Sequence, residues 1–139
     1  MAGLSLQAVS TGLATLINVS AVTSLVGSRI YDDIPQAPTF PFVWYEVQEA
    51  SDERGFGTGG LPLVELRVHA FSTYEGGREA QQILAAVIGV LKDQALTASG
   101  YEQAGRIEYR RTLLLPDELI QGVKCRELVA FFELWVEET

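Results

Sequence analysis

LPLVELRVHAFS, residues 61–72, is the clearest β-strand in the sequence. Its side chains alternate between an apolar set and a polar set: Val64, Leu66, Val68 and Ala70 against Glu65, Arg67 and His69. This period of two is typical of a strand with one face on a core and the other face in a wetter setting. The stretch therefore predicts a sheet that is buried on one side.

The segment that follows, residues 77–95, is predicted to be a helix. Its apolar positions recur at helical spacing and form a stripe along one face: Ala80, Ile83, Leu84, Val87, Ile88 and Leu91. Because this stripe and the apolar side of the strand complement each other, we expect the helix to lie on the strand.

The rest of the chain extends this helix-on-sheet unit. Apolar spacing predicts a first helix over residues 6–17 and a short second one over residues 20–26, which Gly27 ends. Further strands are predicted over residues 42–50, 105–115 and 123–136. This order predicts an α+β fold in one domain, residues 1–139: an antiparallel sheet of about four main strands with two main helices packed on one face.

Composition narrows the class of protein. The chain has 139 residues and a net charge of −8, with ten Lys and Arg against eighteen Asp and Glu. This balance argues against a nucleic-acid groove, which needs clustered cations. A single cysteine, Cys125, excludes an internal disulfide. The sequence has no run of about 18 apolar residues, so no membrane span is predicted. The N-terminus lacks the basic region of a signal peptide.

The sheet face opposite the helices is predicted to mix aromatic and charged side chains. With the expected registers it carries Trp44, Glu46, Arg67, His69, Phe71, Tyr109, Phe131 and Trp135. Such mixtures are typical of surfaces that are partly buried on association, and we select Trp44, Arg67, Phe131 and Trp135 as interface residues. The alternative is a merely amphipathic outer face.

The glycine-rich loop 51–60 is a second candidate for partner contact. It holds four glycines, whose conformational freedom favours disorder in the free subunit. Such a loop can become ordered when it contacts a partner. Arg54 and Phe56 are the expected contact residues, because arginine and aromatic side chains are common interface anchors.

The sequence contains few patterns typical of catalytic or metal-binding sites. His69 is the only histidine and is expected to be a partly exposed strand residue, without the partners that a triad or a zinc site needs. The adjacent carboxylates Asp32–Asp33 and Asp52–Glu53 lack the spacing of a calcium loop. Cys125 is expected to pack as a small hydrophobe.

Two further motifs are also uninformative about chemistry. GFGTGG, residues 55–60, lies between strands and lacks the GK[ST] ending of a phosphate loop. Arg110 and Arg111 are expected to point to opposite sheet faces. We therefore predict no enzyme activity, no cofactor and no metal site.

One long stretch resembles a known family. In SAVTSLVGSRIYDDIPQAPTFPFVWYEV, residues 20–47, a small-residue helical turn is followed by Gly27, Arg29, Ile30, Tyr31, Pro35, Pro41, Phe42 and Tyr45. This run resembles the opening of the tail completion or tail terminator proteins of long-tailed bacteriophages and gene transfer agents. The later layout fits too, with a strand ending near Phe71, a helix starting around Arg78 and a final strand closing with Leu134, Trp135 and Val136.

The resemblance implies a structural virion protein. Such subunits assemble in the host cytoplasm into a ring, here a homo-hexamer, at the head-proximal end of the tail tube, in the neck of the virion. The ring ends tube growth and joins the tail to the head, so the implied partners are other copies of the chain, the tail tube protein and the head–tail connector or head-closure protein. DNA would pass through the channel without specific binding.

An acidic channel wall would keep DNA from sticking. The loop carboxylates that are candidates for facing the lumen are Asp32, Asp33, Asp52, Glu53, Asp117 and Glu118. Two alternatives stay open: another neck adaptor, such as a head-closure or connector protein, and an unrelated cytoplasmic α+β module that binds a small molecule between helices and sheet.

Overall fold

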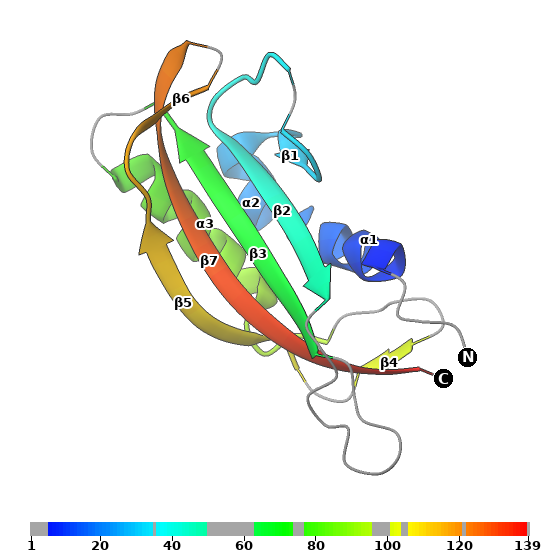
Figure 1. Cartoon of the computed structure of the whole chain (residues 1–139). Helices are drawn as coiled ribbons and strands as arrows, with labels where there is room; N and C mark the ends of the chain where they lie inside the picture. Colours follow the sequence, from blue (N-terminus) through cyan, green and yellow to red (C-terminus); the bar gives the residue numbers. More distant parts are fainter. Residues whose placement is uncertain are drawn as a thin grey trace.

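The helices of this protein lie on one side of a twisted sheet (Figure 1). The structure is a computed structural model, and it describes residues 6–34, 36–49, 63–73, 77–95, 101–103, 106–120 and 122–138. The predicted loop 51–60 falls outside these residues.

Three helices and seven strands make up the described chain. In order they are α1 Leu6–Ile17, α2 Ser20–Val26, β1 Ile30–Tyr31, β2 Phe42–Glu49, β3 Leu63–Ser72, α3 Arg78–Leu91, β4 Tyr101–Gln103, β5 Glu108–Leu114, β6 Glu118–Ile120 and β7 Val123–Glu138. The four longer strands β2, β3, β5 and β7 and the two longer helices α1 and α3 confirm the α+β prediction.

Strand β3 is central, as its sequence pattern predicts. It pairs antiparallel with β2 from Phe42–Phe71 to Glu49–Val64, and on its other side with β7. The other edge of β7 pairs antiparallel with β4, β5 and β6 along different parts of its 16 residues. The short β1 runs parallel to β2, so the sheet is mixed and not purely antiparallel as expected.

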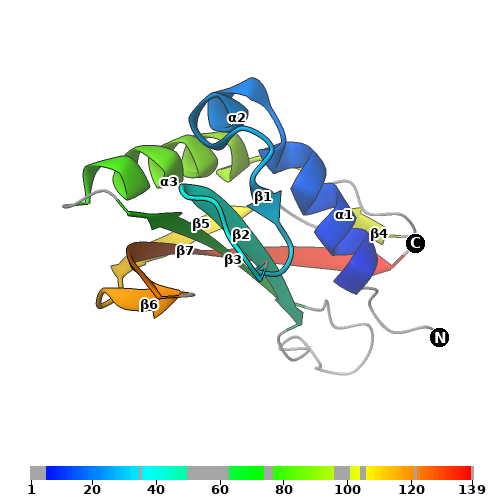
Figure 2. The same cartoon turned by 90° about the horizontal axis from the view of Figure 1, so that it is seen from above.

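The three helices lie on one side of the sheet (Figure 2). The alternating apolar residues of the strands are buried together with those of the helices in one core. From α3 it receives Ala80, Ile83, Leu84, Val87 and Leu91, the stripe that the sequence predicts. From β3 it receives Val64, Leu66, Val68 and Ala70, all fully buried. Helix α2 ends at Gly27, whose φ of 61° suits glycine and lets its N–H bond to the carbonyl of Thr23.

Within the described residues, no single helix is long and apolar enough to cross a membrane. The segments Val9–Ile17 and Ser20–Val26 reach that length and apolarity only as a pair, bent by 77° at their junction. Their buried residues Val9, Leu13, Ile17, Val22 and Val26 belong to the core.

Candidate functional site

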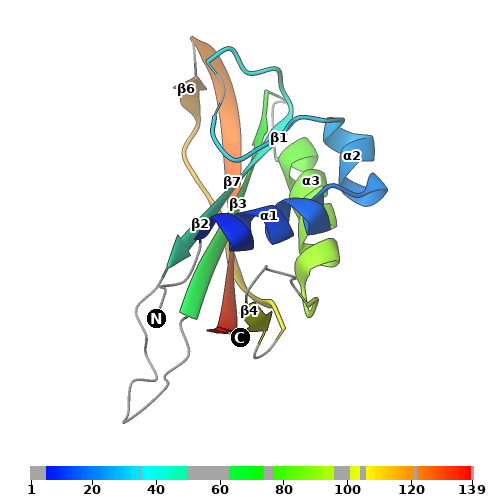
Figure 3. The same cartoon turned by 90° about the vertical axis from the view of Figure 1, so that its right-hand side faces the viewer.

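The sheet face turned away from the helices carries the functional candidates, and we call it the outer face. Across β2, β3 and β7 its residues lie in rows, such as Phe42–Phe71–Glu127 and Glu46–Arg67–Phe131. The β6–β7 hairpin lies on this side of the sheet, as Figures 2 and 3 both show. The outer face has three parts: an apolar end, a histidine cluster and an arginine cluster.

The apolar end is a second small core. Phe42, Phe71 and Cys125 are buried there, and the rings of Phe42 and Phe71 stack with their centroids 4.6 Å apart. Ile120 of the β6–β7 hairpin packs against this cluster. Burial, with the nearby carboxylates adding to it, raises the pKa of the Cys125 thiol to about 11. The thiol therefore stays protonated near neutral pH and serves packing, as predicted.

His69 is at the centre of the outer face, between two carboxylates. Its Nε2 lies 2.6 Å from Oε2 of Glu46, and its Nδ1 hydrogen-bonds Oε2 of Glu127. The Trp44 ring stacks on the imidazole with centroids 4.2 Å apart. His69 is only 7% exposed, so the expectation of a partly exposed residue is wrong, because the Trp44 ring covers it. Each ring nitrogen of His69 thus has a carboxyl group as its hydrogen-bond partner.

Glu118 of β6 extends this cluster. It hydrogen-bonds the buried Glu127, and this bond, with burial and the charge of Glu127, raises the pKa of Glu118 to about 7. Glu118 therefore joins the β6–β7 hairpin to Glu127, which in turn hydrogen-bonds His69. Next to it, hydrogen bonding to Arg126 lowers the pKa of the exposed Asp117.

Stability is expected to depend on pH through Glu118. Because folding raises its pKa from 4.5 to about 7, the folded protein holds the extra proton between these values. The contribution of protonated Glu118 to the free energy of unfolding is complete below pH 4.5 and is lost as the pH rises through 7. The loss is on the order of 1 kcal/mol, since solvent screens an exposed carboxyl. Urea unfolding between pH 4.5 and 8.5 should give a flatter profile for Glu118→Gln than for the parent; parallel profiles would contradict this.

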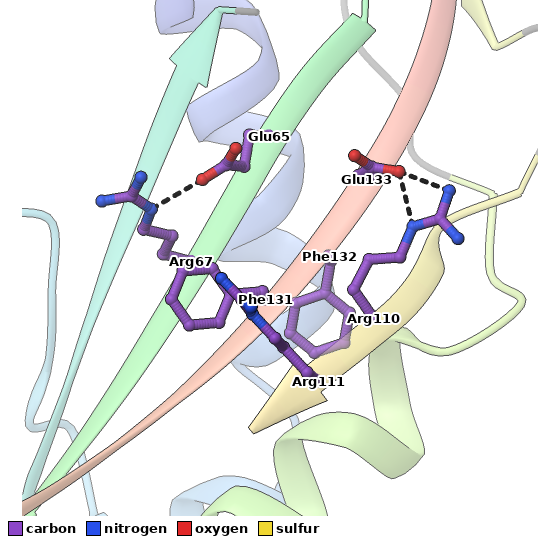
Figure 4. A pocket seen from close by; sticks show the side chains of 7 residues that line it. All are labelled: Glu65, Arg67, Arg110, Arg111, Phe131, Phe132 and Glu133. Atoms are coloured by element: carbon purple, nitrogen blue, oxygen red, sulfur yellow. Dashed lines mark hydrogen bonds and ion pairs between the residues drawn. The ribbon is translucent and has the colours of Figure 1, made fainter. Parts of the chain in front are cut away.

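The arginine cluster surrounds Phe131 (Figure 4). The guanidinium carbons of Arg67 and Arg111 lie 5.4 and 4.9 Å from the centre of its ring, within the range of cation–π contacts. Arg67 donates from Nε to Glu65 at 2.8 Å, and Arg110 turns to Glu133. Together with Phe132 these side chains line a hollow of about 400 Å³.

A β-bulge places both neighbouring arginines on the outer face. The register of β5 against β7 shifts between Tyr109 and Arg111. Arg110 therefore reaches Glu133 while Arg111 lies over Phe131, and the expectation that they point to opposite faces is wrong. Tyr109 also differs from expectation, because it packs on Phe132 at the inner face.

The predicted interface residues are partly brought together. Trp44, Arg67 and Phe131 lie on the outer face, with Trp44 in the histidine cluster and the other two in the arginine cluster. The backbone of Trp135 pairs with Leu63 at the far end of β7. Arg54 and Phe56 lie outside the described residues.

The predicted acidic residues are spread over the molecule. Asp32 and Asp33 are exposed just after β1. Asp117 pairs with Arg126 and Lys124, and Glu118 belongs to strand β6 and not to a loop. Asp52 and Glu53 lie outside the described residues. In the part of the chain that the structure describes, no three His, Cys, Asp or Glu residues are grouped to hold a metal ion.

Sequence reasoning missed the carboxylate partners of His69. In the ladder His69 is directly opposite Trp44 and Val129. Glu46 lies two residues after Trp44 and Glu127 two residues before Val129, so both are diagonal neighbours of His69. Diagonal neighbours are within reach of long side chains, but they can be identified only when the register is known. The sequence did contain a signal for this cluster. It has a single histidine on one predicted strand and glutamates on the same face of the two neighbouring strands.

Comparisons with known proteins agree with this architecture. No curated protein is significantly similar in sequence. Among the solved structures, a chain of a native gene transfer agent virion particle is similar, with a TM-score of 0.76, 17% identity and coverage of 97% of this chain and 99% of that one. Another solved chain has a TM-score of 0.64 at 11% identity, with 99% of each chain covered. These likenesses show a shared fold.

The family match is more specific. The family described as "Tail completion protein gp17" matches residues 13–125, which run from α1 to the start of β7. That span includes most of the inner core, the β6 strand and the Glu46, His69 and Arg111 positions of the outer face. The chain belongs to the tail completion protein gp17 family.

Proposed function

We propose that this protein is a structural virion subunit that forms a ring of about six copies at the head-proximal end of the tail tube. The ring ends tube growth and joins the tail to the head, without catalysis. The observation that carries the proposal is the tail completion family match over residues 13–125. The likeness of nearly the whole chain to a chain of a gene transfer agent virion supports it.

The partners follow from this position. We infer that each subunit, acting as one domain over residues 1–139, contacts neighbouring copies, the tail tube protein below and the connector or head-closure protein above. The mixed outer face suits such contacts, because aromatic and arginine side chains are enriched in interfaces. The surplus of acidic residues suits a channel through which DNA slides, and carboxylates facing it would be drawn from the six acidic candidates.

Imaging of the native particle tests the proposal. Symmetry-averaged density should place a ring of about six copies directly above the last ring of the tail tube. Particles made without the chain should carry tubes of irregular length that are not joined to heads. A single copy, or a two-fold dimer, would contradict the ring. Density above a separate terminating ring, next to the head, would instead favour a head-closure or connector role, which is the second candidate.

A further inference from the structure

We propose that Arg67, Phe131 and Arg111 form a docking site for carboxylates of a second copy of this chain, and that Asp32 and Asp33 supply them. This inference rests on the proposed ring and names the contact between its neighbouring subunits. It assigns Asp32 and Asp33 to that contact, so the candidates for the channel wall reduce to the other four carboxylates.

The site is built by three adjacent strands. Arg67 of β3, Phe131 of β7 and Arg111 of β5 stand opposite one another in one row of the ladder. Both guanidinium carbons lie within 5.4 Å of the centre of the same ring. Two guanidinium groups thus contact one phenyl ring on the outer face, where they line the hollow of about 400 Å³.

Two cations at one ring repel each other unless an anion compensates them. The Arg67 guanidinium uses Nε for Glu65, which leaves its terminal nitrogens to donate elsewhere. Arg111 has no carboxylate partner among the described residues, whereas Arg110 is paired with Glu108 and Glu133. Arginine forks bind carboxylates with two parallel hydrogen bonds, so the chemistry of the site fits an acidic side chain.

Charge complementarity points to another copy as the source of that side chain. Acidic residues outnumber basic ones eighteen to ten in this chain. The arginine cluster of one subunit is therefore complementary in charge to the acidic surface of another copy. Among the described strands, β5 and β1 lie on opposite sides of the β2–β3–β7 centre of the sheet. A contact from one edge to the opposite edge is heterologous, and repeated contacts of this type close a ring.

Asp32 and Asp33 are well placed at the β1 edge. Both are exposed, and Asp32 makes no ion pair with any described residue. The backbone at this point is fixed, because the indole Nε1 of Trp44 donates to the Asp32 carbonyl at 3.2 Å. The Asp33 carboxylate accepts the Ile34 N–H at 2.9 Å, which holds the turn. The Asp32 carboxylate is therefore presented to solvent on an ordered turn.

A charge exchange tests the contact in assembled particles. Arg111→Asp alone and Asp32→Arg alone should each lower the fraction of joined head–tail particles, counted by electron microscopy, at least about tenfold, since each lost ion pair recurs around the ring. The double variant Arg111→Asp/Asp32→Arg should return to within about threefold of the parent. Arg78→Asp, the same charge change at the exposed start of α3, should leave joining unchanged.

The outcomes separate this inference from the proposed function. Normal joining by Arg111→Asp, with the parent's ring still visible, overturns the docking site alone. A loss of joined particles that the double variant does not restore also overturns the docking site. If Arg111→Asp then also weakens binding to duplex DNA, the anion that the arginine cluster binds is a phosphate. Absence of any ring in parent particles overturns the proposed function itself. Thermal melting of each purified variant, expected within a few degrees of the parent, excludes misfolding as the cause.

Discussion

Replacing His69 with glutamine is expected to lower the free energy of unfolding by about 3–5 kcal/mol at pH 7. The imidazole lies between the carboxylates of Glu46 and Glu127, and Glu127 is only 6% exposed. Glutamine cannot place one nitrogen at each carboxyl group as the imidazole does, so the buried Glu127 carboxyl would be left without its hydrogen-bond partner. The stacking contact with Trp44 would be lost as well. Urea unfolding, monitored by circular dichroism, measures the change.

A second variant separates charge from packing. In His69→Gln/Glu127→Gln a neutral amide replaces the buried carboxyl group. At least half of the lost free energy of unfolding should therefore return. Arg110→Gln is the surface comparison, since the Arg110 side chain is half exposed and its pairs with Glu108 and Glu133 should contribute no more than about 1 kcal/mol. A loss below about 1 kcal/mol in His69→Gln would mean that solvent already compensates Glu127, and the histidine cluster would have no structural role.

The inner face of the sheet could be predicted from the sequence because its signal is local. The alternation of β3 and the stripe of α3 each follow from residues close together in the chain, and both lie in the core as expected. Gly27 and the proline-rich stretch after Tyr31 likewise mark their own boundaries. For these elements, burial of apolar surface decides the structure, and the pattern reports it directly.

For the outer face, the sequence predicts which residue types lie there but not which side chains contact one another. Those contacts depend on the register between strands that are far apart in the chain. The pairing of His69 with Glu127 joins residues 58 positions apart, across a diagonal of the ladder. The bulge at Arg110 reverses the alternation of β5, and nothing in the sequence EYRRTLL marks it. One inserted residue thus decides which arginine reaches Phe131, and a local pattern carries no information about it.

Two neighbouring phenylalanines offer the sharpest test of the two faces. Phe132 is fully buried at the inner face, where it packs against Tyr109, whereas Phe131 is partly exposed at the outer face under the two arginines. Phe132→Ala should lower the free energy of unfolding by about 3–5 kcal/mol, because it removes buried contacts and leaves a cavity. Phe131→Ala should cost only about 1–2 kcal/mol, mainly the two cation–π contacts.

Assembly should respond in the opposite order at a temperature where both variants remain folded. Phe131→Ala removes the ring that orients Arg67 and Arg111, so it should reduce the fraction of joined particles several-fold although the subunit is stable. Phe132→Ala keeps Arg67, Phe131 and Arg111, the three residues of the proposed docking site, so its folded fraction should join normally. Unfolding curves and particle counts on the same preparations give both quantities. If joining followed stability alone across the two variants, the outer face would have no part in assembly, because only loss of folded subunits would then limit the ring.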